Sequence, residues 1–255
     1  MTLTRNIPTM RNSALWLLAI ILLMVFVTSA YSQGRRSRRG VEQNDPTATE
    51  LIVARLHFGT NGWIGHRGWS HNYPASDQNF NEFIKRSTGI NVDVLSYRVV
   101  ELSSEEIFDY PFVYISEPGE MALTAQEVTN LSEYIKRGGF ILMDDFDGAV
   151  QTANMKSQVY RSFPGQSFIE IQTDDTFFNI HFQLENLEGM APYVPGENIS
   201  YNAILNDTGR IGIAAGYNND LANFWEWYYL GEMPLKPATD AFRLGVNAVV
   251  YSMTH

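Results

Sequence analysis

The stretch "LTAQEVTNLSEYIKRGGFILMDDFDG", residues 123–148, decides the fold class. Thr124 and Glu127 have the spacing of a capping box, which predicts that a helix begins there. Apolar residues then recur at helical spacing, and the paired glycines end the helix. The apolar run "FILM", 140–143, follows at once and predicts a short buried strand.

The same alternation of strand and helix continues along the chain. Strands are predicted at 50–58, 90–97, 110–116, 140–143, 167–172 and 210–217. Helices are predicted at 78–89, 124–139, 153–163 and 240–255, with a short helical turn at 102–108 capped by Ser103 and Glu106. Apolar strands that alternate with helices indicate an α/β fold, a mainly parallel sheet with helices on both faces. We expect one domain, 49–255, with at least four parallel strands and with 50–58, 111–116 and 140–143 at the centre of its sheet.

Residues 1–32 have the pattern of a signal peptide. Basic residues precede the apolar run "ALWLLAIILLMVFV", 14–27, and the small residues of "TSA" follow it. The run is shorter than the roughly 20 residues that a transmembrane helix needs. We therefore expect export to the periplasm, or export of another kind, and keep an uncleaved anchor in the inner membrane as the alternative. The "RRSRR" tract belongs to a basic flexible linker, 33–48, and this N-terminal segment is the only expected membrane contact.

Charge and cysteine content exclude several kinds of function. All 28 acidic residues follow residue 40, whereas six of the 18 basic residues precede it, so the remainder carries a net charge of −16. That charge argues against a nucleic-acid partner, because phosphate binding needs Lys and Arg. The chain has no cysteine, which excludes disulfides, thiolate nucleophiles and cysteine-ligated metal sites.

Three carboxylates follow the predicted strand at 140–143. Asp144, Asp145 and Asp147 are candidate catalytic residues, since neighbouring carboxylates can divide acid and base roles. Asp144 and Asp145 are also candidate oxygen ligands for a divalent cation, the only cofactor considered. In the structural alternative, one Asp accepts N–H bonds from the next helix and has a lowered pKa.

Two other strand ends carry acidic and aromatic residues. Glu117, with Glu120 nearby, follows the strand at 110–116 and is a candidate ligand-binding residue. "YNNDLANFWEW", 217–227, supplies the candidate ligand-binding residues Asp220 and Trp225 and the candidate catalytic residue Glu226. Carboxylates beside aromatic rings suit carbohydrate recognition, and a packed tryptophan cluster is the alternative.

The loop after the first strand is rich in aromatic residues and histidine. Trp69 and Asn79 are candidate ligand-binding residues in or just after this loop, whose aromatic rings suit stacking or a packed lid. A second hypothesis assigns a transition-metal site, and local hydrogen bonding is its alternative. The residues of that metal hypothesis are His57, His66, His71 and Asp77, and the remaining loop aromatics are Trp63 and Tyr73.

The order of these motifs resembles the bacterial proteins grouped as "Domain of Unknown Function 4159". The motifs that carry the resemblance are "YPASDQNF" (73–80), "FDYPFVYIS" (108–116), the stretch 123–148, "NDLANFWE" (219–226) and "LGVNAVVYSMTH" (244–255). The resemblance implies a fold similar to class I glutamine amidotransferases and flavodoxin-like domains, and export from the cytoplasm. It implies no particular activity.

The resemblance also shows two departures. In amidotransferase-like domains the strand after the paired glycines leads to a nucleophilic cysteine, whereas this chain has Asp144 and Asp145 there. Glutaminase chemistry of that type is therefore excluded. Relatives tend to have Asp-His-Pro where this chain has "DDT", 174–176, so no histidine-dependent role is expected at that position.

The first functional hypothesis is an exported cell-envelope domain that binds a ligand or partner and lacks the cysteine nucleophile. Envelope proteins and carbohydrate are its expected partners. The rival hypothesis is a carboxylate-dependent hydrolase that acts on a carbohydrate or envelope polymer, which requires two carboxylates to converge on one cleft. A third is a degenerate enzyme fold with a structural role.

Overall fold

The computed structural model describes residues 44, 46, 49, 51–62, 67–187 and 192–255. Contacts divide the chain into residues 1–43 and a compact unit at 44–255. The predicted signal peptide or anchor, most of the linker, Trp63 and His66 lie outside the described residues. Within the described part, no helix combines the length and the apolar character that crossing a membrane requires.

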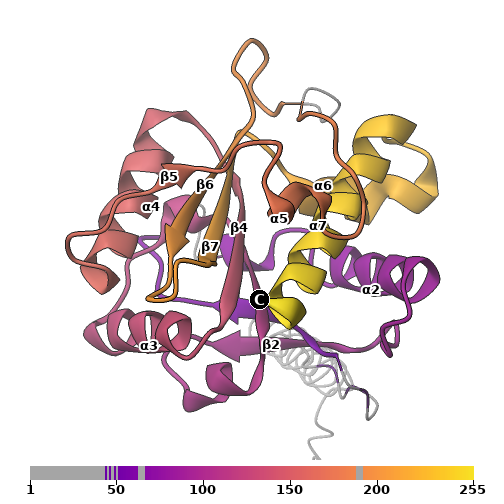
Figure 1. The fold of residues 1–255 in the computed structure, drawn as a ribbon. Helices are drawn as coiled ribbons and strands as arrows, with labels where there is room; N and C mark the ends of the chain where they lie inside the picture. The colour runs from indigo at the N-terminus through magenta and orange to yellow at the C-terminus, as the bar shows by residue number, and fades with distance from the viewer. Residues whose placement is uncertain (1–43, 45, 47–48, 50, 63–66, 188–191) are drawn as a thin grey trace, which may run out of the picture. The chain divides into compact units, whose positions relative to one another are not determined.

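The described residues form one seven-stranded sheet, which confirms the α/β class (Figure 1). The first five strands in spatial order are parallel, and the sixth pairs antiparallel with both of its neighbours. In spatial order the strands are β2 (Tyr97–Glu101), β1 (Val53–His57), β3 (Phe112–Ser116), β4 (Phe140–Phe146), β7 (Ile211–Tyr217), β6 (Ser200–Leu205) and β5 (Ile169–Glu170). The three strands predicted to be central are flanked on both sides, as expected. The narrower likeness to flavodoxin-like and amidotransferase-like domains stays a prediction.

Helices cover both faces of the sheet (Figure 1). One face carries α3 (Ala125–Lys136) and α4 (Gly148–Ser162), which contact each other. The other face carries α2 (Ala75–Ser87), α5 (Thr176–Asn179), α6 (Leu221–Trp227) and α7 (Leu235–Thr254). Four short 3-10 helices lie in the described loops: η1 (Gly68–Ser70), η2 (Glu105–Asp109), η3 (Pro118–Glu120) and η4 (Tyr228–Leu230).

Aromatic rings fill the core beneath α2, α6 and α7. Phe80 of α2 stacks on Trp225 of α6 with ring centroids 4.3 Å apart, and both are almost fully buried. Gly245 of α7 permits this approach, because a Cβ there would lie 2.6 Å from the Phe80 ring. Helices α2 and α6, which are far apart in the sequence, therefore pack closely against each other.

Several predicted elements need correction. The strand predicted at 90–97 is wrong: Asp93 and Ser96 form a turn, and β2 begins only at Tyr97. Ser104, rather than Ser103, caps the following helical turn by accepting the Glu106 N–H. Strand β6 and helix α6 have no counterpart in the prediction, and helices α4 and α7 begin about one turn earlier than predicted.

Strand β4 differs from its prediction in a way that shapes the site. It continues beyond Met143 through Asp144 and Asp145 to Phe146, so the first two aspartates lie in the strand and not in a turn after it. The pairing of β4 with β7 shifts register between Met143 and Phe146. The irregular stretch contains Asp144 and Asp145, and such bulges are common beside functional sites.

Candidate functional site

Four neighbouring parallel strands end at the same edge of the sheet, and each leads into a segment with an ionisable side chain. His71 follows η1 in the loop after β1, and Glu117 directly follows β3. Asp145 lies near the end of β4, and Asp220 begins α6 after β7. Ligand sites of open α/β sheets form at this edge.

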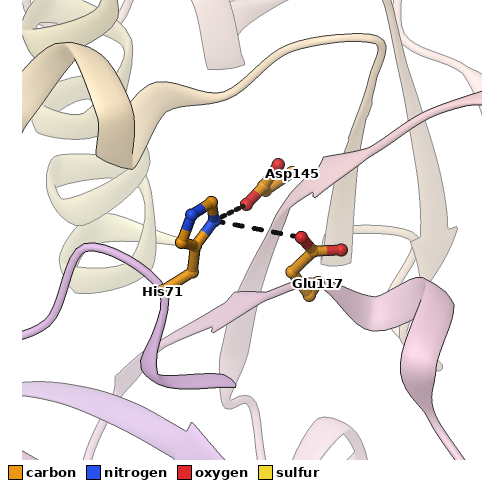
Figure 2. A group of neighbouring side chains, drawn as sticks. All are labelled: His71, Glu117 and Asp145. Carbon is orange, nitrogen blue, oxygen red and sulfur yellow. Dashed lines mark hydrogen bonds and ion pairs between the residues drawn. The ribbon is translucent and has the colours of Figure 1, made fainter. Parts of the chain in front are cut away.

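Three of these side chains converge on a small volume (Figure 2). The Nδ1 atom of His71 lies 2.8 Å from the Oδ2 atom of Asp145 and 3.9 Å from the Oε1 atom of Glu117. One ligand atom from each residue lies within 4.8 Å of the other two. The His71 side chain is 53 % exposed, whereas those of Glu117 and Asp145 are 15 % and 11 % exposed, so the group is open on the histidine side.

The charges in this group interact strongly. The hydrogen bond to Asp145 raises the pKa of His71 to about 9. Burial, followed by repulsion from Asp145, raises the pKa of Glu117 to about 8. The same two causes raise the pKa of Asp220 to about 7. Near neutral pH the group is therefore rich in bound protons, because the charged forms of its carboxylates repel one another.

The backbone around the group is strained. Glu117 has a φ of 53° and Asp145 a φ of 65°, and two asparagines beside the group, Asn72 and Asn218, also have positive φ. These four are the only non-glycine residues with positive φ in the described part of the chain. Such conformations cost roughly 1–2 kcal/mol per residue, and they concentrate at functional sites.

Asp144 is fully buried behind the group and serves the structure. Its Oδ2 atom accepts hydrogen bonds from the Tyr114 hydroxyl and the Leu221 N–H, each at 2.7 Å, and from the Ala222 N–H at 3.2 Å. It thus caps α6 and not the next helix along the chain. Its pKa is raised, and not lowered as the capping hypothesis predicted, because burial and the charges of Asp220 and Asp145 outweigh these bonds.

Asp147 lies beside the group and makes no side-chain cap for α4. Its backbone N–H donates instead to the Gln151 side chain at 3.0 Å. Partial burial raises the pKa of Asp147, with smaller contributions from Asp145 and Glu197. The capping alternative therefore holds for neither Asp147 nor Asp145.

A buried arginine fixes the loop that carries His71. Arg55 of β1 is 1 % exposed and donates to Asp77 through Nε at 3.0 Å and Nη2 at 2.9 Å. Its Nη1 atom donates to the carbonyl oxygens of Trp69 and His71, each at 3.1 Å. The position of the histidine backbone thus depends on a buried ion pair with Asp77 of α2.

The structure places other predicted site residues outside the group. Trp225 is 2 % exposed and belongs to the core, which corrects its prediction as an accessible ligand-binding residue. Trp69 is also buried, against His57 and Tyr73. The Asn79 amide donates to the carbonyl oxygens of Trp225 and Glu226, so it joins α2 to α6.

The predicted histidine metal site does not form from its described members. His57 pairs with Glu101 at 2.5 Å, and Asp77 pairs with Arg55.

Two other acidic candidates have partners in the protein. Glu226 accepts from the Asn72 amide at 2.5 Å, and its charge contributes to the raised pKa of Asp220. Glu120 accepts from the Gly68 N–H at 3.1 Å, so it holds η1.

The sequence predicts His71 as a candidate metal ligand but with other partners, and it does not predict Tyr193. The contact between His71 and Asp145 depends on strand order, so the sequence does not group them. Tyr193 is exposed, yet Asp145, Asp147, Asp220 and Glu117 all contribute, after burial, to raising its pKa. No local pattern marks either residue as part of an acidic site.

Comparison with known proteins identifies the family. The family model described as "Domain of unknown function (DUF4159)" matches residues 53–253. This range includes His71, Glu117, Asp145 and Asp220, which together are called the acidic group. No curated protein matches the chain. Because the family model covers most of the sequence and every strand of the sheet, the chain belongs to the DUF4159 family.

Proposed function

We propose that this domain binds a divalent transition-metal ion through His71, Glu117 and Asp145, and that the ion forms the centre of a ligand-binding site. The observation that carries the proposal is the convergence of one nitrogen and two carboxylate oxygens within 4.8 Å. A metal ion about 2.0–2.2 Å from each atom would need only small side-chain movements.

The ligand types favour particular ions. One imidazole and two carboxylates suit Zn²⁺ or Mn²⁺, whereas Ca²⁺ takes six to eight oxygen ligands. Ser116 supports the arrangement, because its hydroxyl lies 3.5 Å from the Oδ2 atom of Asp145. Arg55 supports it through the His71 carbonyl.

The protonation of the group also supports the proposal. With pKa values near 9 for His71 and 8 for Glu117, both residues hold a proton at neutral pH. A divalent metal ion would displace one proton from each of these two residues. The two charges of the ion would then replace the two charges of the protons, and the net charge of the site would stay the same. The strained backbone at Glu117 and Asp145 supports a functional role for these two residues in particular.

Isothermal titration of the purified domain with Zn²⁺ and Mn²⁺ tests the proposal. We expect one ion per chain, at least about tenfold weaker binding in His71→Ala, and proton release seen as different heats in buffers of different ionisation enthalpy. His181→Ala is the matched control, because His181 is exposed and its ring contacts the Ser87 carbonyl. Equal affinity of both variants and the native protein would refute the site.

We propose further that the domain acts in the cell envelope, in contact with envelope proteins or carbohydrate. The support is the apolar run at 14–27 with its basic and small-residue flanks. N-terminal sequencing of protein from fractionated cells should find a start near Tyr31 or Gln33 in the periplasm. An intact Met1 or Thr2 on membrane-bound protein would favour the anchor.

Hydrolysis by carboxylates is the second candidate function. Its support is that Glu117 and Asp145 converge with carboxylate oxygens within 4.8 Å, which is slightly closer than the roughly 5–5.5 Å of retaining glycosidases. A protonated Glu117 would act as general acid. Hydrolysis of an envelope glycan that persists in excess chelator and disappears in Glu117→Gln would establish this alternative over the metal site.

A further inference from the structure

A groove of about 640 Å³ lies between α4 and the strands β6 and β7. Its volume falls within the range of small-molecule sites. One wall is the first two turns of α4, and the floor comes from alternate residues of the strands, Ser200 and Asn202 of β6 and Ala215 and Tyr217 of β7. The helix wall consists of Gly148, Ala149, Thr152, Ala153, Met155 and Lys156.

The groove adjoins the acidic group but does not share its residues. Phe146 lines the groove and directly follows Asp145 in β4. At its other border, the Tyr217 hydroxyl donates to Glu197. The charge of Glu197 contributes, after burial and Asp145, to the raised pKa of Asp147, so Asp147 lies between the groove and the acidic group.

The lining offers donors, acceptors and aromatic carbon together. Lys156 donates, Glu197 accepts, and the Asn202 amide does both. Tyr217 adds a partly exposed aromatic ring, which packs against the buried ring of Phe146 with ring centroids 6.0 Å apart. Small residues leave room above the floor, where Gly148 and Ala149 have little or no side chain.

This combination decides between ligand classes. A purely apolar ligand would leave these polar groups unpaired, which is costly. A phosphorylated ligand would meet a single Lys or Arg, Lys156, among the lining residues, all of which are described, and Glu197 of the same lining would repel it. A sugar ring presents C–H groups on its faces and hydroxyl groups around its edge, so it matches aromatic surface bordered by mixed donors and acceptors.

We infer that this groove is a binding subsite for a neutral oligosaccharide. Tyr217 supplies the aromatic platform, and Asn202, Lys156 and Glu197 pair with ring hydroxyls. The subsite goes beyond the metal proposal and does not need the ion, since none of its lining residues is a proposed ligand. A chain of sugars that extends past Asp147 would also reach the acidic group.

Isothermal titration with cellohexaose and with tri-N-acetylchitotriose tests the inference on the full domain. At least one probe should bind, and Tyr217→Ala and Asn202→Ala should each weaken its binding by about tenfold or more. Tyr217→Phe should weaken it less, because the ring remains. Tyr229→Ala is the control, since Tyr229 is an exposed tyrosine elsewhere and its loss should change nothing.

The outcomes separate the two proposals. Each variant is also titrated with Zn²⁺, and unchanged metal affinity shows that the acidic group is intact. If Tyr217→Ala does not fold, Asn202→Ala decides. The inference is overturned if neither probe binds at millimolar concentration, or if binding is equal in the native protein and the groove variants, whatever the metal titration gives.

Discussion

Two charged clusters meet at the loop that carries His71, and they balance the cost of burying charge in opposite ways. In the first, Arg55 and Asp77 are 1 % and 3 % exposed, and the arginine is matched by the carboxylate and by backbone carbonyls. In the second, His71 faces Glu117, Asp145 and Asp220, three carboxylates with one potential cation. The first cluster is complete within the protein, whereas the second needs protons or an added cation.

The difference distinguishes structural charge from functional charge. A buried pair with all its hydrogen bonds made is a fixed part of the fold, and removal of one partner leaves a costly unpaired charge. A cluster whose pKa values are raised by folding makes the folded state less stable when its protons leave. Such a group is expected where a ligand supplies the missing charge.

The largest expected effect is on the complete cluster. Arg55→Met should lower the free energy of unfolding by about 3–5 kcal/mol, because Asp77 would be left buried without its partner. Chemical denaturation measures the change. Arg137→Met is the control, since Arg137 pairs with Glu133 on an exposed surface and should cost less than about 1 kcal/mol. Similar values for the two variants would contradict the distinction.

The acidic group should show the reverse, a stability that depends on its protons. Folding raises the pKa of Asp220, Glu117 and His71 above 3.8, 4.5 and 6.5 to about 7, 8 and 9. The folded state therefore binds more protons, and its added stability is complete below the lower values and lost as pH rises through the higher ones.

We accordingly expect the metal-free protein to lose at least about 1 kcal/mol between pH 5 and pH 9, seen as a Tm lower by roughly 2–4 °C or more. Thermal unfolding in a chelating buffer measures it. Glu117→Gln should flatten this dependence and be more stable than the native protein at pH 9. A stability that rises with pH over this range would contradict the assignment.

A smaller effect concerns the hydrogen bond between His71 and Asp145. In Asp145→Asn the pKa of His71 should fall from about 9 toward 6.5, because the main cause of its elevation is removed. NMR titration of the ring protons follows this change. Signals of His181 should be the same in both proteins, and an unchanged His71 titration would show that the two side chains are not paired in solution.

The smallest effect is expected for the asparagine variant of Asp144, a residue that belongs to the structural side of the comparison despite its position. Asp144→Asn should change stability by less than about 1 kcal/mol, since asparagine also accepts N–H bonds at a helix start. Asp144→Ala should cost about 1–3 kcal/mol by leaving the N–H groups of Leu221 and Ala222 unpaired. Denaturation curves for the two variants, each with metal titration, separate capping from ligation.

Local signals allowed part of this molecule to be predicted. The capping box at Thr124 and Glu127 is present as predicted, because its contacts span only three residues. The strand predicted at 90–97 was wrong because the same alternation of apolar and polar residues also fits a turn. In that turn the Asp93 side chain accepts the Leu95 N–H. The strand that pairs with β1 begins only at Tyr97, which lies opposite Val53, and this pairing depends on tertiary contacts that the local sequence does not show.

The candidate site was only partly predictable for the same reason. Carboxylates at strand ends are visible in the sequence, and Glu117, Asp145 and Asp220 do lie at one edge of the sheet. Asp144 contacts Tyr114 in the core and Asp145 contacts His71, and no sequence pattern marks the irregularity of β4 at these two residues. The histidine lies 74 residues before its partner and meets it only through the strand order.

The most direct test of the account is an anomalous-scattering map from crystals grown with Mn²⁺ or Zn²⁺ at pH 8. The account predicts one strong peak per chain, about 2.0–2.3 Å from His71 Nδ1 and from a carboxylate oxygen of both Glu117 and Asp145. It also predicts that Asp145→Asn abolishes the peak while the Arg55–Asp77 pair stays unchanged. A map without a peak at these residues, or with metal only at surface carboxylates, would contradict the claim that this group awaits a cation.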